Sequence, residues 1–352
     1  MRPPTGPAAS TGSASGPAAG PPRGRDRLGP LARGCADALA ATFPDLGGAV
    51  TDAAEARRIL AAAPARPAPP PAVGSVRDLA VPGADGAPPV PVRVYRPDPR
   101  RWPAPRPTVV FCHGGGWVLC DLDSYDSTVR ELCRASGAVL VSVGYRRAPE
   151  ARFPAAAYDA WAVLRWAGEH VTALGGDPGA LVVAGDSAGG NLAVASLLLA
   201  RERGGPPVAL QALAYPCLDA AADTPSYRSD AEGYFLTAAH LRWFWEQYLG
   251  PGGDGRHPLA SPLRAALAGL PPAHVVTAGC DPLRDEGAAY VRALRAAGVR
   301  AARDHHQGMF HGFLALPGLL PQARQALDRL GGAVASTLSD GKTSGRDGGV
   351  AG

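Results

Sequence analysis

The clearest candidate for chemistry is a serine in the segment 185–189, which reads GDSAG. A short apolar run at 181–184 precedes this segment, and a helix-like stretch at 191–203 follows it. A serine flanked by glycines at a strand–turn–helix junction can present its hydroxyl as a nucleophile, because small residues allow the sharp turn. The chain has 45 glycines, so the pattern arises easily by chance and needs support from other residues.

A glycine-rich segment upstream offers that support. Residues 113–117 read HGGGW and follow an apolar run at 108–112 that is typical of a buried strand. Three glycines after a strand let backbone N–H groups face a ligand, which suits an oxyanion hole. The alternative is a plain glycine-rich loop in a glycine-rich protein, which the preceding strand and the serine segment make less favourable.

A serine nucleophile needs a base, which in this arrangement follows the serine and an acid in chain order. Six histidines follow the serine, and His311 is favoured because it lies beside a glycine in a loop after the last predicted strand. His305 and His306 fall at the end of a strand-like stretch, where at most one of them can face the site. His240 is expected on a helix, and His274 begins an apolar strand, so both are interpreted as structural.

Asp281 is the favoured carboxylate for orienting the base. It follows the apolar strand 274–279 almost at once, which places it at the same sheet edge as the serine. Asp285 and Glu286 follow closely and compete for this role. They are more typical of the first turn of a helix, where acidic side chains interact favourably with the helix dipole.

Together these segments resemble the hormone-sensitive-lipase group of α/β-hydrolase esterases. The resemblance extends over about 200 residues, with the motifs in the order of that family. The matching segments are HGGGW at 113–117, YRRAPE at 145–150, FPA at 153–155, GDSAGGNLA at 185–193, YP at 215–216, DPLRD at 281–285 and HGF at 311–313. The resemblance implies an α/β-hydrolase fold, with a mostly parallel sheet of about eight strands, helices on both faces and a helical cap.

Carried over position by position, the resemblance implies that Ser187 is the nucleophile, His311 the general base and Asp281 its orienting acid. Glu150 matches an acid of the family, which we interpret as structural support. Arg147 departs from the usual family motif in the same segment. This departure lies near the supporting residues and does not affect the triad.

The resemblance also implies an oxyanion hole made by the backbone N–H groups of Gly114, Gly115 and Ala188. It implies short- to medium-chain acyl esters as substrates, bound in a capped pocket. Trp117 and Phe310 are our candidates for side chains that line this pocket. A triad of this type requires no metal or organic cofactor.

Composition agrees with a globular enzyme, since 46% of the residues are apolar and 19% are charged. The net charge of +4 is small for 352 residues, and no basic–aromatic pattern indicates a nucleic-acid partner. The six cysteines include no C-x-x-C pair, which argues against a zinc site and favours reduced thiols and a cytoplasmic location. Neither a secretory signal nor an apolar run long enough to span a membrane is evident.

The chain divides by composition and periodicity into a catalytic domain with appendages. We expect a disordered tail rich in Pro, Gly and Ala at 1–30, cap helices and a proline-rich linker at 31–74, the catalytic domain at 75–338 with a further cap contribution from 220–270, and a flexible tail at 339–352.

The expected function is a serine carboxylesterase acting on a small-molecule ester. The same triad could serve an amidase, a lactonase, a carbamate hydrolase or an acyltransferase, because all of them form an acyl-enzyme. A non-catalytic small-molecule receptor on this fold is a further alternative, which the presence of a complete triad disfavours. Members of the family are often dimers, so a homodimer is an open possibility.

Overall fold

The computed structural model describes residues 1, 27–63 and 69–343, with side chains as far as residue 338. A single sheet contains all eight of the strands in these residues, in the order β1-β2-β4-β3-β5-β6-β7-β8. The strands are β1 (Ser75–Val81), β2 (Val90–Arg96), β3 (Arg106–Cys112), β4 (Val139–Val143), β5 (Gly176–Asp186), β6 (Leu210–Ala214), β7 (Ala273–Cys280) and β8 (Ala301–Phe310). β2 runs antiparallel to both of its neighbours, and the remaining pairs are parallel. This topology confirms the predicted fold class.

The central strands are apolar on both faces because helices cover the sheet on both sides. In β3, Val109 and Phe111 belong to one core cluster, whereas Val110 and Cys112 belong to the other. This alternation follows from the two-residue period of a strand. A continuous apolar run is therefore what a central parallel strand requires.

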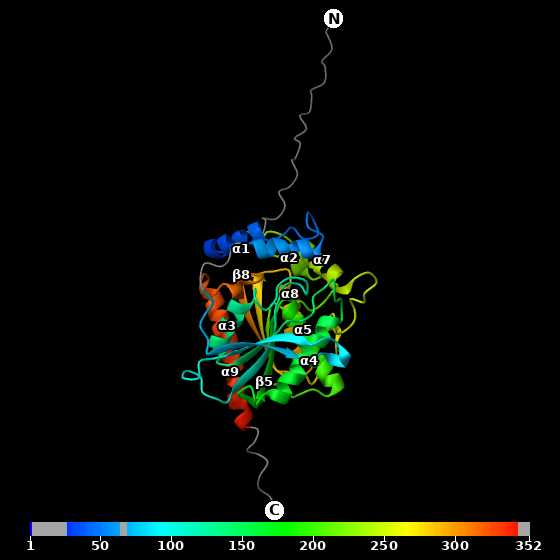
Figure 1. Cartoon of the computed structure of the whole chain (residues 1–352). Helices are drawn as coiled ribbons and strands as arrows, with labels where there is room; N and C mark the ends of the chain where they lie inside the picture. The colour runs from blue at the N-terminus through cyan, green and yellow to red at the C-terminus, as the bar shows by residue number, and fades with distance from the viewer. Residues whose placement is uncertain (2–26, 64–68, 344–352) are drawn as a thin grey trace, which may run out of the picture.

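Two groups of helices form the outer layers. The helices α3 (Asp126–Ser136) and α9 (Pro321–Thr343) cover one face, to the left of the sheet in Figure 1. The helices α4 (Ala155–His170), α5 (Ala188–Arg203) and α8 (Arg284–Ala296) contribute to the core on the other face, with α4 and α5 to the right in the same view. The carboxyl ends of the parallel strands lie toward the end of the molecule that α1 and α2 cross.

Helices from two distant parts of the chain meet at this end. They are α1 (Pro30–Thr42) and α2 (Ala53–Ala62) from the N-terminal part, and α7 (Ala238–Leu249) from the segment between β6 and β7 (Figure 1). The indole N–H of Trp243 on α7 donates a 3.1 Å hydrogen bond to the carbonyl of Thr51, just before α2. The ring of Phe43, at the end of α1, packs edge-on against Phe235. These contacts are what a two-part cap requires.

The predicted boundaries of the two tails and of the catalytic domain differ from the observed elements near both ends of the chain. Parts of the predicted tails and linker lie outside the described residues, namely 2–26, 64–68 and 344–352. The described end of the predicted N-terminal tail is packed, because Leu28 is buried and α1 already begins at Pro30. The last helix runs to Thr343, which is beyond the predicted end of the catalytic domain.

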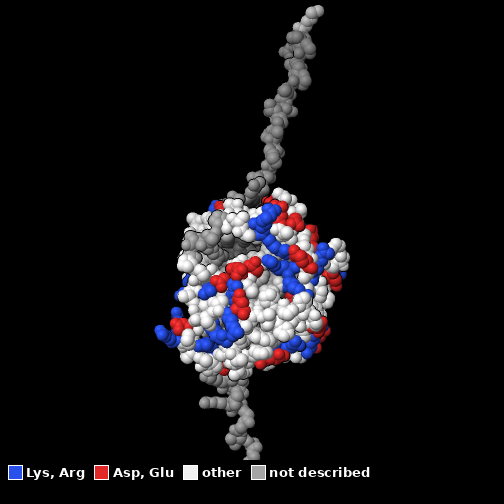
Figure 2. All heavy atoms as spheres, in the orientation of Figure 1, with Lys and Arg blue, Asp and Glu red and all other residues white. Residues whose placement is uncertain are grey.

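The described surface is of mixed charge. On the face drawn in Figure 2, acidic and basic side chains lie interspersed and do not gather into one basic patch. Ion pairs such as those of Arg93 with Asp78 and Asp123, at 2.7 and 2.8 Å, follow this pattern. Among the described residues, no helix combines the length and the apolar character that crossing a bilayer requires.

Candidate active site

Ser187 lies in the tight turn between β5 and α5. Its backbone adopts φ 54° and ψ −122°, a conformation that a residue with a side chain rarely takes without support. The support comes from two backbone hydrogen bonds, from the Ser187 N–H to the Ala214 carbonyl (2.9 Å) and from the Cys217 N–H to the Ser187 carbonyl (3.1 Å). A side chain at Gly189 would overlap the carbonyl of Cys112, so this position needs glycine. The predicted strand–turn–helix junction is confirmed.

The structure brings the three predicted triad residues together. The imidazole Nε2 of His311 lies 2.9 Å from the Oγ of Ser187, and its Nδ1 lies 2.9 Å from a carboxylate oxygen of Asp281. A proton on Nδ1 donates to this carboxylate and leaves Nε2 free to accept the serine proton, which is the tautomer that the contacts favour. The second oxygen of Asp281 accepts a hydrogen bond from the Leu283 N–H at 2.8 Å. Both oxygens of this fully buried carboxylate therefore have a hydrogen-bond partner.

Two of the competing histidines, His305 and His306, have other partners. His305 and His306 lie inside β8, which extends to Phe310, and not at the end of the strand as predicted. His305 Nδ1 lies 2.9 Å from the hydroxyl of Thr277, and His306 lies 3.1 Å from Asp304. Because both histidines lie within this long edge strand and not at its carboxyl end, the strand keeps them away from the serine.

The glycines of the HGGGW segment have backbone conformations that favour glycine. Gly115 and Gly116 adopt φ values of 98° and 60°. A side chain at Gly116 would overlap the ring of Phe244 on α7, and one at Gly114 would lie 2.7 Å from the carboxylate of Asp186. The segment therefore passes closely between the cap and the nucleophile turn.

The carboxylate of Asp186, the residue before the serine, lies close to the glycine segment. The hydroxyl of Tyr125 donates to its carboxylate at 2.8 Å. Burial raises the pKa of Asp186 to about 6, and the hydrogen bond from Tyr125 acts in the opposite direction. The motif itself contained this residue, but nothing in the sequence indicated where its side chain points.

His113 supports the same segment from behind. Its Nδ1 lies 2.7 Å from the Gly114 carbonyl, and its ring stacks on Tyr145 with centroids 4.2 Å apart. The Tyr145 hydroxyl in turn donates to the His113 carbonyl at 2.9 Å. Burial lowers the pKa of His113 to about 4, so the imidazole is neutral near pH 7. These contacts hold the backbone at the start of the glycine segment.

Glu286, a competitor of Asp281 in the sequence, has a supporting role that the sequence did not indicate. It does lie in the first turn of α8, as predicted, but its side chain is fully buried. Its carboxyl group accepts backbone N–H groups from Leu218 and from Asp219, the latter at 3.0 Å. Burial raises the pKa of Glu286 to about 8. The loop held in this way begins at Cys217, whose N–H donates to the Ser187 carbonyl, so Glu286 supports the nucleophile turn indirectly.

The two predicted pocket residues are packed inside the protein. Trp117 is 1% exposed and stacks on Tyr248 of α7, with ring centroids 4.2 Å apart. Phe310 is completely buried in the core cluster that α3 and α9 cover. Both placements are those of core residues, so a role in lining the acyl pocket gains no support from the structure.

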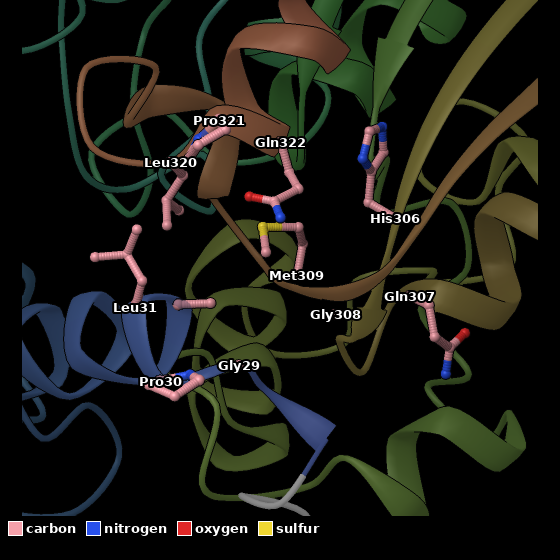
Figure 3. A pocket seen from close by; sticks show the side chains of 11 residues that line it. Gly29, Pro30, Leu31, His306, Gln307, Gly308, Met309, Leu320, Pro321 and Gln322 are labelled. Atoms are coloured by element: carbon pink, nitrogen blue, oxygen red, sulfur yellow. The ribbon is translucent and has the colours of Figure 1, made fainter.

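A surface cavity lies between α1, the end of β8 and the start of α9. It has a volume of about 470 Å³. Figure 3 shows Leu31, Met309 and Leu320 pointing toward one another across it. No triad residue belongs to its lining, so this cavity is separate from the candidate active site.

Metal-binding chemistry has no obvious site in the described part of the chain, where no group of three or more His, Cys, Asp or Glu side chains is placed to hold an ion. All six cysteines are free thiols.

Known proteins share both the sequence and the fold. A family model described as the α/β-hydrolase fold matches residues 109–315. The carboxylesterase NlhH of Mycobacterium tuberculosis is 43% identical over 255 residues, which span 70% of this chain and 78% of the relative. The chain belongs to the hormone-sensitive-lipase-like group of α/β-hydrolase esterases.

Two further esterases are similar to this chain, one in sequence and one in structure. The ethyl acetate hydrolase of Pseudomonas putida is 39% identical over 255 residues, covering 72% of this chain and 80% of its own. A solved structure of a hyperthermophilic esterase from Pyrobaculum calidifontis superposes with a TM-score of 0.79 at 37% identity, covering 88% of this chain and 99% of its own. The region matched by the family model begins in β3 and ends after His311, and so includes every candidate catalytic residue of this esterase.

Proposed function

We propose that this enzyme hydrolyses carboxylic esters with short to medium acyl chains, using Ser187, His311 and Asp281 as a catalytic triad. The observation that carries the proposal is the pair of 2.9 Å hydrogen bonds that joins the three side chains. Relatives named as a carboxylesterase and as an ethyl acetate hydrolase support an ester substrate, and the second name supports a short acyl group.

The proposed reaction has two acyl-transfer steps. His311 Nε2 removes the hydroxyl proton as Ser187 Oγ attacks the ester carbonyl, and it then donates this proton to the leaving alcohol. In the second step His311 deprotonates a water molecule, which attacks the acyl-enzyme. His311 then returns this proton to Ser187 Oγ as the bond to the acyl group breaks and the carboxylic acid leaves. Asp281 keeps the proton on Nδ1 and stabilises the imidazolium that forms in each step.

Three backbone N–H groups are the proposed donors to the oxyanion. Ala188 is the first residue of α5, where backbone N–H groups have no partner within the helix and the helix dipole favours negative charge. Gly115 supplies the second donor from the glycine segment. Gly114 is the proposed third donor, since its backbone lies close to the nucleophile turn: a Cβ there would come within 2.7 Å of the Asp186 carboxylate. Removal of one such donor typically lowers turnover by about 10²- to 10³-fold.

Hydrolysis of p-nitrophenyl esters from acetate to palmitate tests the proposal, with wild type and Ser187→Ala compared side by side. We expect the rate to peak at short to medium acyl chains and to vanish in the variant. A variant as active as the wild type would refute the assigned nucleophile. A folded wild type that cleaves none of these esters but acylates amines or opens lactones would show another acyl transfer by the same triad.

A further inference from the structure

The backbone after the glycine segment forms a strained turn, residues 115–120, which we call the oxyanion turn. The Gly115 carbonyl accepts the N–H groups of Val118 and Leu119 at 3.1 and 2.8 Å. Trp117 and Cys120 adopt φ values of 61° and 64° although neither is a glycine. Such residues keep these conformations only when the surrounding structure holds them. The position of the Gly115 N–H therefore depends on the residues that hold this turn in its conformation.

One of the residues that holds the oxyanion turn comes from the cap. Arg57, on α2, donates from Nε to the Val118 carbonyl at 2.8 Å. Its Nη2 also donates to the Ala148 carbonyl at 2.7 Å, and the Ala148 N–H donates to the Trp117 carbonyl at 3.0 Å. A single guanidinium thus binds the turn directly and also through the loop that follows β4.

Glu150 orients this guanidinium. Its two carboxylate oxygens accept from Nη1 and Nη2 of Arg57 at 2.6 and 2.9 Å, and these hydrogen bonds lower the pKa of Glu150 to about 2. A bidentate pair fixes the plane of the guanidinium, which an ammonium group could not do. The Arg57 side chain is 20% exposed, whereas that of Arg58, the next residue, is 71% exposed and pairs with Glu55 on its own helix, at 3.2 Å.

We propose that Arg57 is a positioning residue for the oxyanion hole, and that the docking of α2 thereby sets the place of the oxyanion turn. The inference rests on the proposed function. The far end of the turn is held from the catalytic domain, where Arg147 donates to the Cys120 carbonyl at 2.7 Å. Without Arg57, the buried carbonyl of Val118 would need another donor, and the turn would shift toward the side that remains held.

The test compares Arg57→Gln and Arg57→Lys with Arg58→Gln as the matched control. Three quantities are measured for each protein: kcat and KM for p-nitrophenyl butyrate, with active sites counted by a fluorophosphonate; the inhibition constant of a trifluoromethyl ketone, which forms a tetrahedral adduct; and hydrogen–deuterium exchange of residues 115–120. The thermal midpoint separates these effects from general loss of structure.

We expect Arg57→Gln to lower kcat per active site by about 10- to 100-fold, because a small misplacement of catalytic groups has effects of this size. The inhibition constant should rise by a similar factor, KM should change little, and exchange in the turn should increase. Arg57→Lys should fall between Arg57→Gln and the wild type, and Arg58→Gln should match the wild type. Wild-type kcat, inhibition and exchange in Arg57→Gln would overturn the inference, even with a lowered thermal midpoint. An inactive wild type would count against the proposed function instead, and the exchange comparison would still show whether Arg57 holds the turn.

Discussion

Replacement of Glu286 by glutamine should remove a large part of the pH dependence of stability. Glutamine keeps an acceptor oxygen for the N–H groups of Leu218 and Asp219 but can never ionise. Two opposing effects act on the native carboxyl group. The backbone donors favour the carboxylate, whereas burial favours the protonated acid, and burial is the larger effect because it raises the pKa to about 8.

The magnitude follows from the change in this pKa. A move from the ordinary value of 4.5 to about 8 disfavours the ionised form by about 5 kcal/mol, at about 1.4 kcal/mol for each pKa unit. The unfolded chain loses the proton near its ordinary pKa, whereas the native protein keeps it until about pH 8. Unfolding between these limits therefore releases a proton, and the native state loses stability as the pH rises. Between about pH 5.5 and 8.5 this loss amounts to about 3 kcal/mol.

Urea unfolding of wild type and Glu286→Gln at these two pH values measures the effect. The wild type should lose about 3 kcal/mol more than the variant on going to the higher pH. The other ionisable groups are the same in both proteins, so their contributions largely cancel in the difference. Parallel losses in the two proteins would show that native Glu286 is already ionised at the lower pH, and the reasoning from burial would fail.

Two further predictions test the triad and the packing of α9. Asp281→Asn should keep the fold but lower kcat by roughly 10⁴-fold, because the amide favours the wrong tautomer of His311. Ester hydrolysis measures kcat, and a loss of less than tenfold would contradict the role of Asp281. Gly332→Ala should stabilise the protein by about 0.5 to 1 kcal/mol, since a Cβ there meets nothing within 4 Å and alanine favours helix. Gly331→Ala should destabilise it, because its Cβ would lie 2.7 Å from the backbone of Ala135 on α3. Urea unfolding compares the pair, and equal effects would refute the packing argument.

The triad could be predicted because its residues are tied to the ends of elements that the sequence marks clearly. Ser187 and Asp281 each follow an apolar run, and parallel strands bring their carboxyl ends to one edge of the sheet. His311 directly follows β8. The place of His305 and His306 was harder to predict, because polar residues in an edge strand look like a loop.

The supporting residues could not be predicted because their partners are remote in the sequence. Glu286 looks like any acidic residue in the first turn of a helix, and only the fold brings it to Leu218, 68 positions away. Arg57 meets Glu150 across 93 positions. Nothing near either residue in the sequence distinguishes it from solvent-exposed neighbours such as Arg58.

The first residues of the described chain depend on the last elements of the fold. Arg27 donates to the carbonyl of Gly279, 252 positions later, and Ala32 and Ala36 of α1 pack in the core cluster that α9 completes. During synthesis, the helices that leave the ribosome first must therefore wait for their partner surfaces until nearly the whole chain has been made. Closure of the cap is then a late event in folding, coupled to completion of the sheet, and long-range contacts of this kind slow the search for the native state.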